Sequence, residues 1–163
     1  MKIAELPGNV KALLDEYKKS IDELISVIKN VNSIDLCMIV DNKTEDPECR
    51  SIQTILTHTV GAGYGYINYI ENHSGKNKER MERETFNNAD QYIDALNSMF
   101  AYTEDFFKNN THLETEEKDN SKKINVRWGQ QYDIEQLMEH AIVHILRHRR
   151  QIENFLKLQR SFS

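Results

Sequence analysis

The sequence has 163 residues, two cysteines and a formal net charge of −5. This length suits one domain with a sizeable core, residues 1–163, and is short for two. The acidic balance argues against a nucleic-acid partner, since no surplus of Lys and Arg can replace phosphate counterions. No apolar run approaches the ~20 residues that span a membrane, and no secretory signal pattern opens the chain. We therefore expect a soluble cytoplasmic protein in which Cys37 and Cys49 stay reduced.

Apolar residues at three- and four-residue spacing predict long helices in four parts of the chain. The first expected helix covers about residues 8–31, the second about residues 48–72 and the third about residues 88–109. The fourth begins after Asp133, which can form a capping pair with Gln136. The small number of helix breakers, two prolines and six glycines, agrees with long uninterrupted helices.

The segments between these helices differ in composition. The apolar cluster at residues 36–40 fits either a short strand or a plug at one end of the helices. Residues 75–84 are strongly charged and suit solvated surface, whereas residues 109–123 suit a mobile crossover without a packed element. Residues 124–128 alternate like a short strand or an extended arm. We expect an all-α four-helix bundle with a long crossover connection before the last helix.

Three histidines recur every fourth residue in the last expected helix: His140, His144 and His148. Neighbouring members of this series lie on one helix face about 6 Å apart along the axis, which lets two imidazoles bind one metal ion. The outer two are about 12 Å apart along the axis, too far for a common ion. A helical wheel places His148 within the apolar arc, His144 at its edge and His140 farther toward the polar side. The pair His144 and His148 is therefore expected to face the interior.

A third candidate ligand, His58, comes from the second expected helix. It borders the apolar face of that helix, and its helical neighbours Thr54, Gly61, Ala62 and Gly65 are small. Each glycine inside a helix costs about 1 kcal/mol relative to Ala, so close packing or open space beside His58 should compensate. The alternative for all three candidates is that they are histidines satisfied by hydrogen bonds at the edge of the core.

Three stretches together resemble a known family. Residues 51–58 read S-I-Q-T-I-L-T-H, residues 129–137 read G-Q-Q-Y-D-I-E-Q-L, and residues 144–152 read H-I-L-R-H-R-R-Q-I. In this order and spacing they resemble motifs of the DinB/YfiT-like superfamily of metal-binding four-helix bundles. The chain departs from the family pattern in having Arg150 where a small residue is common, and in adding His140.

The resemblance implies a divalent metal ion, usually zinc or nickel, held by His58, His144 and His148. It also implies a homodimer, as in many relatives. Some relatives are thiol S-transferases or isomerases that use a low-molecular-weight thiol as cosubstrate. His140 is expected beside the metal ligands rather than among them.

Three neutral imidazoles leave an open position at a metal ion, which admits water, a thiolate or a carbonyl oxygen. The first hypothesis is a metal-dependent enzyme of thiol S-transferase or hydrolase type that acts on a small-molecule substrate. The second is a non-enzymatic, stress-associated module that binds metal or a small ligand. The third is a bundle that has lost its metal and whose histidines are merely packed. No catalytic residue is nominated, since Glu139 projects to the solvent face.

Overall fold

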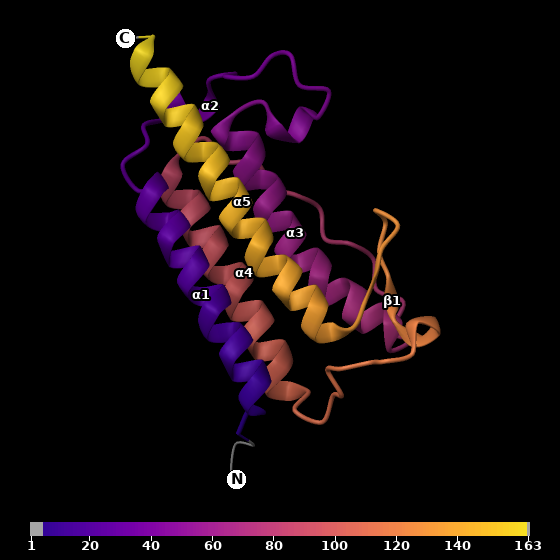
Figure 1. Cartoon of the computed structure of the whole chain (residues 1–163). Coiled ribbons are helices and arrows are strands. Elements are labelled where there is room, and N and C mark those ends of the chain that lie inside the picture. Colours follow the sequence, from indigo (N-terminus) through magenta and orange to yellow (C-terminus); the bar gives the residue numbers. More distant parts are fainter. Residues whose placement is uncertain (1–4, 163) are drawn as a thin grey trace.

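The computed structural model describes residues 5–162, and helices dominate this part of the chain (Figure 1). Its helices of 21 residues or more are α1 (Gly8–Ile28), α3 (Ile52–His73), α4 (Ala89–Asn109) and α5 (Ile134–Ser161). Its shorter elements are α2 (Ser33–Cys37), the 3-10 helices η1 (Pro47–Cys49) and η2 (Asn120–Lys122), and strands β1 (Ile124–Asn125) and β2 (Gln131–Tyr132). The predicted all-α class is confirmed. No described helix is both long enough and apolar enough to cross a membrane.

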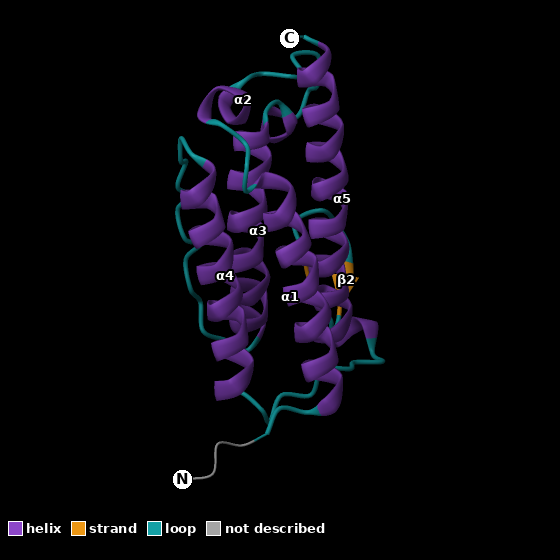
Figure 2. Ribbon diagram, turned by 90° about the vertical axis from the view of Figure 1, so that its left-hand side faces the viewer, coloured by secondary structure: helices purple, strands orange, loops and turns teal. Residues whose placement is uncertain are grey.

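The long helices lie side by side along most of their lengths (Figures 1 and 2). Helices α1 and α3 each pack against both α4 and α5. Side-chain contacts fix the relative directions: Thr57 contacts Tyr92, and farther along Tyr64 packs on Tyr102, so α3 and α4 run parallel. Helix α5 runs antiparallel to α3 (Figure 1).

The direction of the helices determines where the long return of the chain must lie. Because α3 and α4 run parallel, the segment between them has to travel back along the pair, and residues 74–88 do so (Figure 1). Residues 110–133 instead join neighbouring ends of α4 and α5. The crossover therefore precedes α4, which differs from the expected position before the last helix.

Hydrogen-bonding side chains explain where α3 and α5 begin. Ser51 caps α3: its side chain accepts from the Thr54 backbone, and the Thr54 hydroxyl accepts from the Ser51 backbone. Asp133 and Gln136 form the same reciprocal arrangement at the start of α5, which confirms the predicted capping pair. Helix α3 thus starts after Ser51, not near residue 48, which belongs to η1.

Helix α2 closes one end of the molecule. Leu36 on this helix is fully buried, and the Gln159 side chain donates a 2.7 Å hydrogen bond to the backbone oxygen of Asp35. The apolar cluster at residues 36–40 therefore acts as the plug, and the strand alternative is wrong. Cys37 is exposed despite its apolar neighbours, and it and the other cysteine are free thiols.

The connection between α4 and α5 is more closely packed than its polar composition predicted. Thr115 is buried, its hydroxyl accepts a hydrogen bond from Asn9, and its backbone oxygen accepts one from the Glu135 backbone. Strands β1 and β2 pair antiparallel as a short hairpin that leads into α5. The expectation that residues 109–123 lack any packed element is therefore wrong.

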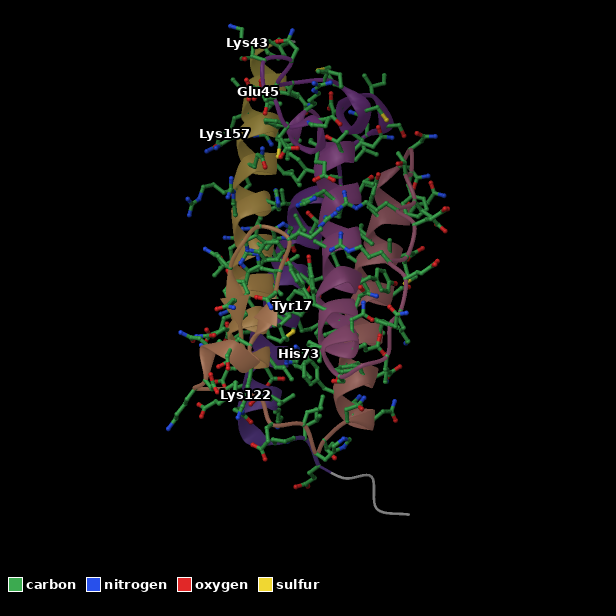
Figure 3. The ribbon with its side chains drawn as sticks, turned by 90° about the vertical axis from the view of Figure 1, so that its right-hand side faces the viewer. Tyr17, Lys43, Glu45, His73, Lys122 and Lys157 are labelled. Carbon is green, nitrogen blue, oxygen red and sulfur yellow. The ribbon has the colours of Figure 1, made fainter. Side chains whose placement is uncertain are left out.

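The two ends of the molecule carry different parts of the chain. Figure 3 shows Lys43 and Glu45, which follow α2, at the same end as Lys157 of α5. It shows His73 and Lys122 toward the opposite end. The loop that precedes α3 is thus near the C-terminal half of α5, and this arrangement brings two distant sequence segments together at the candidate site.

Candidate metal centre

Helices α3 and α5 bring three histidines to one point. The Nε2 atom of His58 on α3 lies 2.8 Å from Nε2 of His144 on α5, and Nε2 of His148 lies 3.0 Å from the same His144 atom. Since α3 and α5 are antiparallel neighbours, a residue in the first third of α3 meets the middle of α5 (Figure 1). One ligand atom from each ring lies within 4.8 Å of the others, a spacing that allows a shared metal ion.

Burial of these side chains follows the helical wheel. His148 is 5% exposed and lies between buried residues of the core face, whereas His144 and His58 are partly buried. The predicted order of burial along α5 is confirmed for His148 and His144. Rings this close cannot all be satisfied by one another, because a neutral Nε2 either donates or accepts and His144 Nε2 faces two others.

The outer ring nitrogens of two histidines have polar neighbours. Nδ1 of His148 is 3.0 Å from the side-chain oxygen of Gln151, one turn later on α5. Nδ1 of His58 is 2.8 Å from Oε2 of Glu48, although the ring N–H is not aligned with that oxygen as a hydrogen bond. An acceptor at Nδ1 places the proton there and leaves the Nε2 lone pair free to bind a metal.

The surroundings keep the imidazoles neutral. Burial, with the neighbouring rings of His148 and His58, lowers the pKa of His144 to about 2. Burial lowers the pKa of His148 to about 4, although the Gln151 hydrogen bond acts in the opposite direction. Burial also lowers the pKa of His58. Neutral imidazole is the form that binds a metal, so the site is in its ligand state near pH 7 without having to lose protons.

His140, the third member of the α5 series, lies in an aromatic cluster beside the site. Its ring stacks on Trp128 at 4.9 Å between centroids, and Tyr132 is also in contact. The Tyr66 ring packs edge-on against both His140 and His144. His140 does not belong to the group of three that could share an ion. The structure thus places it next to the three histidines, as expected for a neighbour rather than a ligand.

Sequence reasoning missed Glu48 as a member of the site. Periodicity predicts that a long helix begins near residue 48, and this gives no reason to expect a contact between the side chains of Glu48 and His58. In the structure the Ser51 cap separates η1 from α3, and the turn carries the Glu48 carboxylate back beside the His58 ring. The only sequence signal was the cap itself, since Ser51 followed by Thr54 marks a helix start.

Side chains from other parts of the chain pack closely against the glycines of α3. A Cβ at Gly61 would lie 2.7–3.0 Å from the side chain of Arg83, and one at Gly63 would lie 2.1 Å from Sδ of Met99. Close approach of other side chains, rather than open space, therefore compensates for the glycines. The Arg83 guanidinium that crosses Gly61 also contacts the Glu48 carboxylate.

Comparison with known families agrees with this arrangement. Residues 41–159 match the DinB family, a span that includes α3, α4 and most of α5. The chain belongs to the DinB family. His58, His144 and His148 all lie inside the region that matches DinB, whereas α1 lies before it. A search of curated protein sequences finds no significant match.

Proposed function

We propose that this DinB-family chain is a metal-dependent enzyme that binds one divalent ion, zinc or nickel, through His58, His144 and His148. The observation that supports this most directly is the convergence of three Nε2 atoms from α3 and α5. Three histidines from two helices provide neutral nitrogen ligands of the kind that zinc and nickel favour.

The spacing of the nitrogens fits a common ion with little movement. Nitrogen ligands 2.0–2.1 Å from a tetrahedral ion lie roughly 3.3 Å apart. The separations of His144 Nε2 from the other two Nε2 atoms, 2.8 and 3.0 Å, are slightly smaller, so these two pairs need to spread by only a few tenths of an ångström, and all three ligand atoms already lie within 4.8 Å of one another. A modest turn of the His58 ring would also align its Nδ1 with Glu48, which lies within reach.

The remaining ligand position supports chemistry on a small molecule. When bound, the ion would supply Lewis-acid chemistry by lowering the pKa of a water or thiol that reaches it. His58, whose side chain is 21% exposed, marks the side on which a substrate can approach. The three histidines would hold the ion, the Gln151 side-chain oxygen contacts Nδ1 of His148, and a Glu48 oxygen lies 2.8 Å from Nδ1 of His58.

The two proposed reaction types differ in the group that attacks. In thiol S-transfer, a low-molecular-weight thiol would lose its proton to solvent water, and its sulfur lone pair would form the new carbon–sulfur bond. The leaving group departs with the electrons of the bond that breaks. In hydrolysis, water takes the place of the thiol. Glu139 on α5 is exposed, so we do not assign it as a general base.

Three further proposals concern the domain organisation, the location and the oligomeric state. We propose that residues 1–163 form one domain, a four-helix bundle of the DinB/YfiT-like type, that acts in the cytoplasm. We also propose a homodimer, for which α5 offers exposed apolar side chains at Val143 and Leu158. Gel filtration with light scattering tests this directly, and a monomer at micromolar concentration would contradict it.

A second candidate function has its own supporting observation. A cavity of about 560 Å³ lies along α3 and α4, and none of the three histidines lines it. A metal centre set apart from this cavity suits a non-enzymatic module in which the ion is structural or regulatory. The two candidates share the metal site and differ in whether it turns over a substrate.

Activity measurements on metal-loaded protein separate the two candidates. The assay uses several low-molecular-weight thiols with electrophilic acceptors, and a panel of small esters and amides for hydrolysis. We expect a metal-dependent rate that His148→Ala abolishes and His73→Ala, at the exposed end of α3, preserves. Equal rates for wild type and His148→Ala, with both variants retaining their helix content, would exclude catalysis at this site.

A further inference from the structure

Residues 78–86, here named the strap, run across the outer side of α3 and α4 and are fixed at both ends. At one end the Asn68 side chain donates to the backbone oxygens of Lys78 and Glu79. At the other end the Gln53 side chain donates to the backbone oxygen of Phe86. The strap thus has defined anchors on the first and last thirds of α3.

Between its anchors the strap is held by side chains. Within the described chain, residues 80–85 form no backbone–backbone hydrogen bond. The Arg83 side chain crosses Gly61 and contacts Glu48, and Arg80 crosses Gly65 and packs over the Tyr69 ring. Side-chain anchors of this kind can release and re-form more easily than a hydrogen-bonded strand or helix. The strap can therefore open without unfolding its neighbours.

The strap covers the cavity of about 560 Å³. This volume lies within the range of about 300–1,000 Å³ that small-molecule sites occupy. Apolar and aromatic side chains from all three walls face it: Val60, Tyr64, Met81, Phe86, Ala95 and Tyr102. Two of these rings, Tyr64 and Tyr102, lie 5.2 Å apart between centroids and form an aromatic wall. The cavity therefore suits a ligand with an apolar or aromatic body.

The uncompensated charge around the cavity is negative. Its basic residues are engaged elsewhere: Lys78 binds Glu71, Arg83 binds Glu48 and Arg80 covers Tyr69. The acidic residues Glu82, Glu84 and Asp94 also line it, and none of them forms an ion pair with a described residue. A cationic group on the ligand would meet unpaired carboxylates here, whereas an anion would be repelled.

Glu71 supplies a further acceptor in the cavity lining. It is 5% exposed, and both of its lysine contacts are made by Oε1. The other oxygen, Oε2, is buried without a hydrogen-bond partner among the described residues. A buried acceptor left without a partner is costly. Because Oε2 has almost no accessible surface, only a ligand that enters while the strap is open could donate a hydrogen bond to it.

We propose that this cavity binds a small organic amine, with its apolar or aromatic body against the wall formed by Tyr64 and Tyr102 and its ammonium group among the unpaired carboxylates. Nothing in this inference depends on the metal site, because none of the three histidines lines the cavity. The strap is the movable wall that admits the ligand.

Titration of the whole protein with 2-phenylethylamine, followed by amide chemical shifts, tests the proposal. We expect saturable binding with shifts confined to the strap and the facing turns of α3 and α4. The neutral analogue 2-phenylethanol should bind about fivefold more weakly, since exposed ion pairs contribute up to about 1 kcal/mol. The anion 3-phenylpropionate should bind more weakly still. No saturable binding of the amine, or equal binding of amine and alcohol, would overturn the proposal.

Variants of the cavity provide matched controls. Asp94→Asn should weaken amine binding severalfold, whereas Asp105→Asn, on the same helix outside the cavity, should leave it unchanged. Ala95→Leu and Ser98→Leu, each checked for retained helix content, should weaken both amine and alcohol by filling the cavity. Unchanged affinity in both leucine variants would overturn the site assignment.

The same titration on metal-free and metal-loaded protein separates this inference from the proposed function. Equal affinities in the two states are expected. An affinity that requires the metal would place the probe at the histidines and overturn the cavity proposal. Failure of the protein to bind metal would remove the proposed function and leave the cavity result standing.

Discussion

The carboxylate of Glu48 lies against the outer nitrogen of His58, with Oε2 2.8 Å from Nδ1. On the other side of the same ring, Nε2 is 2.8 Å from Nε2 of His144. The second oxygen of Glu48 contacts the Arg83 guanidinium, so the carboxylate is held between a cation and the imidazole. Carboxylates in this position orient metal-binding histidines and increase their basicity. We therefore propose Glu48 as the positioning residue for His58.

Replacing Glu48 should weaken metal binding without removing a ligand. Glu48→Ala is expected to lower zinc affinity about 10- to 100-fold, the usual cost of losing such a partner. Glu48→Gln should lower the zinc affinity less, because its amide oxygen can occupy the same place beside Nδ1 of His58. Competition titration with a chelating dye measures the affinities. The absorption spectrum of the cobalt(II)-loaded protein should change as well, which a general loss of stability would not produce.

The matched control for Glu48 is Glu45→Ala in the same loop. Glu45 is exposed and lies at the end of the molecule near Lys157 (Figure 3). Removing its charge should leave both the affinity and the cobalt spectrum as in wild type. Equal losses of zinc affinity in Glu48→Ala and Glu45→Ala would mean that the affinity depends on the total charge of the loop and not on the contact with His58.

Gln151 should have a comparable role for His148. Its oxygen is 3.0 Å from Nδ1, so Gln151→Leu removes the acceptor that fixes the ring proton. We expect zinc affinity to fall about tenfold or more. Arg150→Ala, at the exposed neighbouring position, is the control and should bind zinc normally. Unchanged affinity in Gln151→Leu would show that His148 is oriented by packing alone.

Two glycines of α3 should respond oppositely to the same substitution. Gly63→Ala places a Cβ 2.1 Å from Sδ of the fully buried Met99, so overpacking should exceed the helix-propensity gain. We expect the free energy of unfolding to fall by about 1–2 kcal/mol. In Gly65→Ala the added Cβ contacts only the end of the Arg80 side chain. This substitution should therefore raise the free energy of unfolding by up to about 1 kcal/mol. Urea unfolding of both variants measures the difference, and changes of the same sign would contradict the packing described here.

Acid should destabilise the metal-free protein through its buried histidines. Burial holds the pKa of His144 at about 2 and that of His148 at about 4, while an unfolded histidine titrates near 6.5. Below about pH 6.5, His144 and His148 therefore become protonated in the unfolded chain while they stay neutral in the folded chain. The free energy of unfolding should fall toward pH 4 by up to about 1.4 kcal/mol per pH unit for each histidine. Below pH 4 the contribution of His148 ends, since the folded state then takes up the proton too.

The histidine contribution can be isolated from the titration of carboxylates by comparing variants. Urea unfolding between pH 7 and pH 4.5 should show a shallower pH dependence for His144→Gln than for wild type. His73→Gln, exposed at the end of α3, should keep the wild-type slope. Identical slopes for wild type and His144→Gln would contradict the burial argument.

Much of the fold followed from residue periodicity. The positions of the long helices, the cap at Asp133 and the inward placement of His148 were all recoverable, because each depends on local spacing or on neighbours within one turn. The proximity of His58 to the α5 histidines could not be predicted from periodicity alone. It depends on which helices are neighbours, which the family resemblance supplied and periodicity alone did not.

The features that sequence missed depend on distant contacts. Residues 74–88 look like ordinary charged surface, yet they form the crossover, since the parallel direction of α3 and α4 is a property of the assembled helices. Glu48 joins the site only because a short turn ends before Ser51. Thr115 is buried within a polar stretch because Asn9, 106 residues away, bonds to it. None of these has a local pattern that distinguishes it from a solvated loop.

The most direct test of the metal centre is X-ray diffraction from crystals of the zinc-reconstituted protein, with anomalous data on both sides of the zinc edge. The account predicts one anomalous peak per chain between α3 and α5, bonded to Nε2 of His58, His144 and His148 at about 2.0–2.1 Å. A fully reconstituted protein with no peak there, or with the peak bonded to other residues, would contradict it.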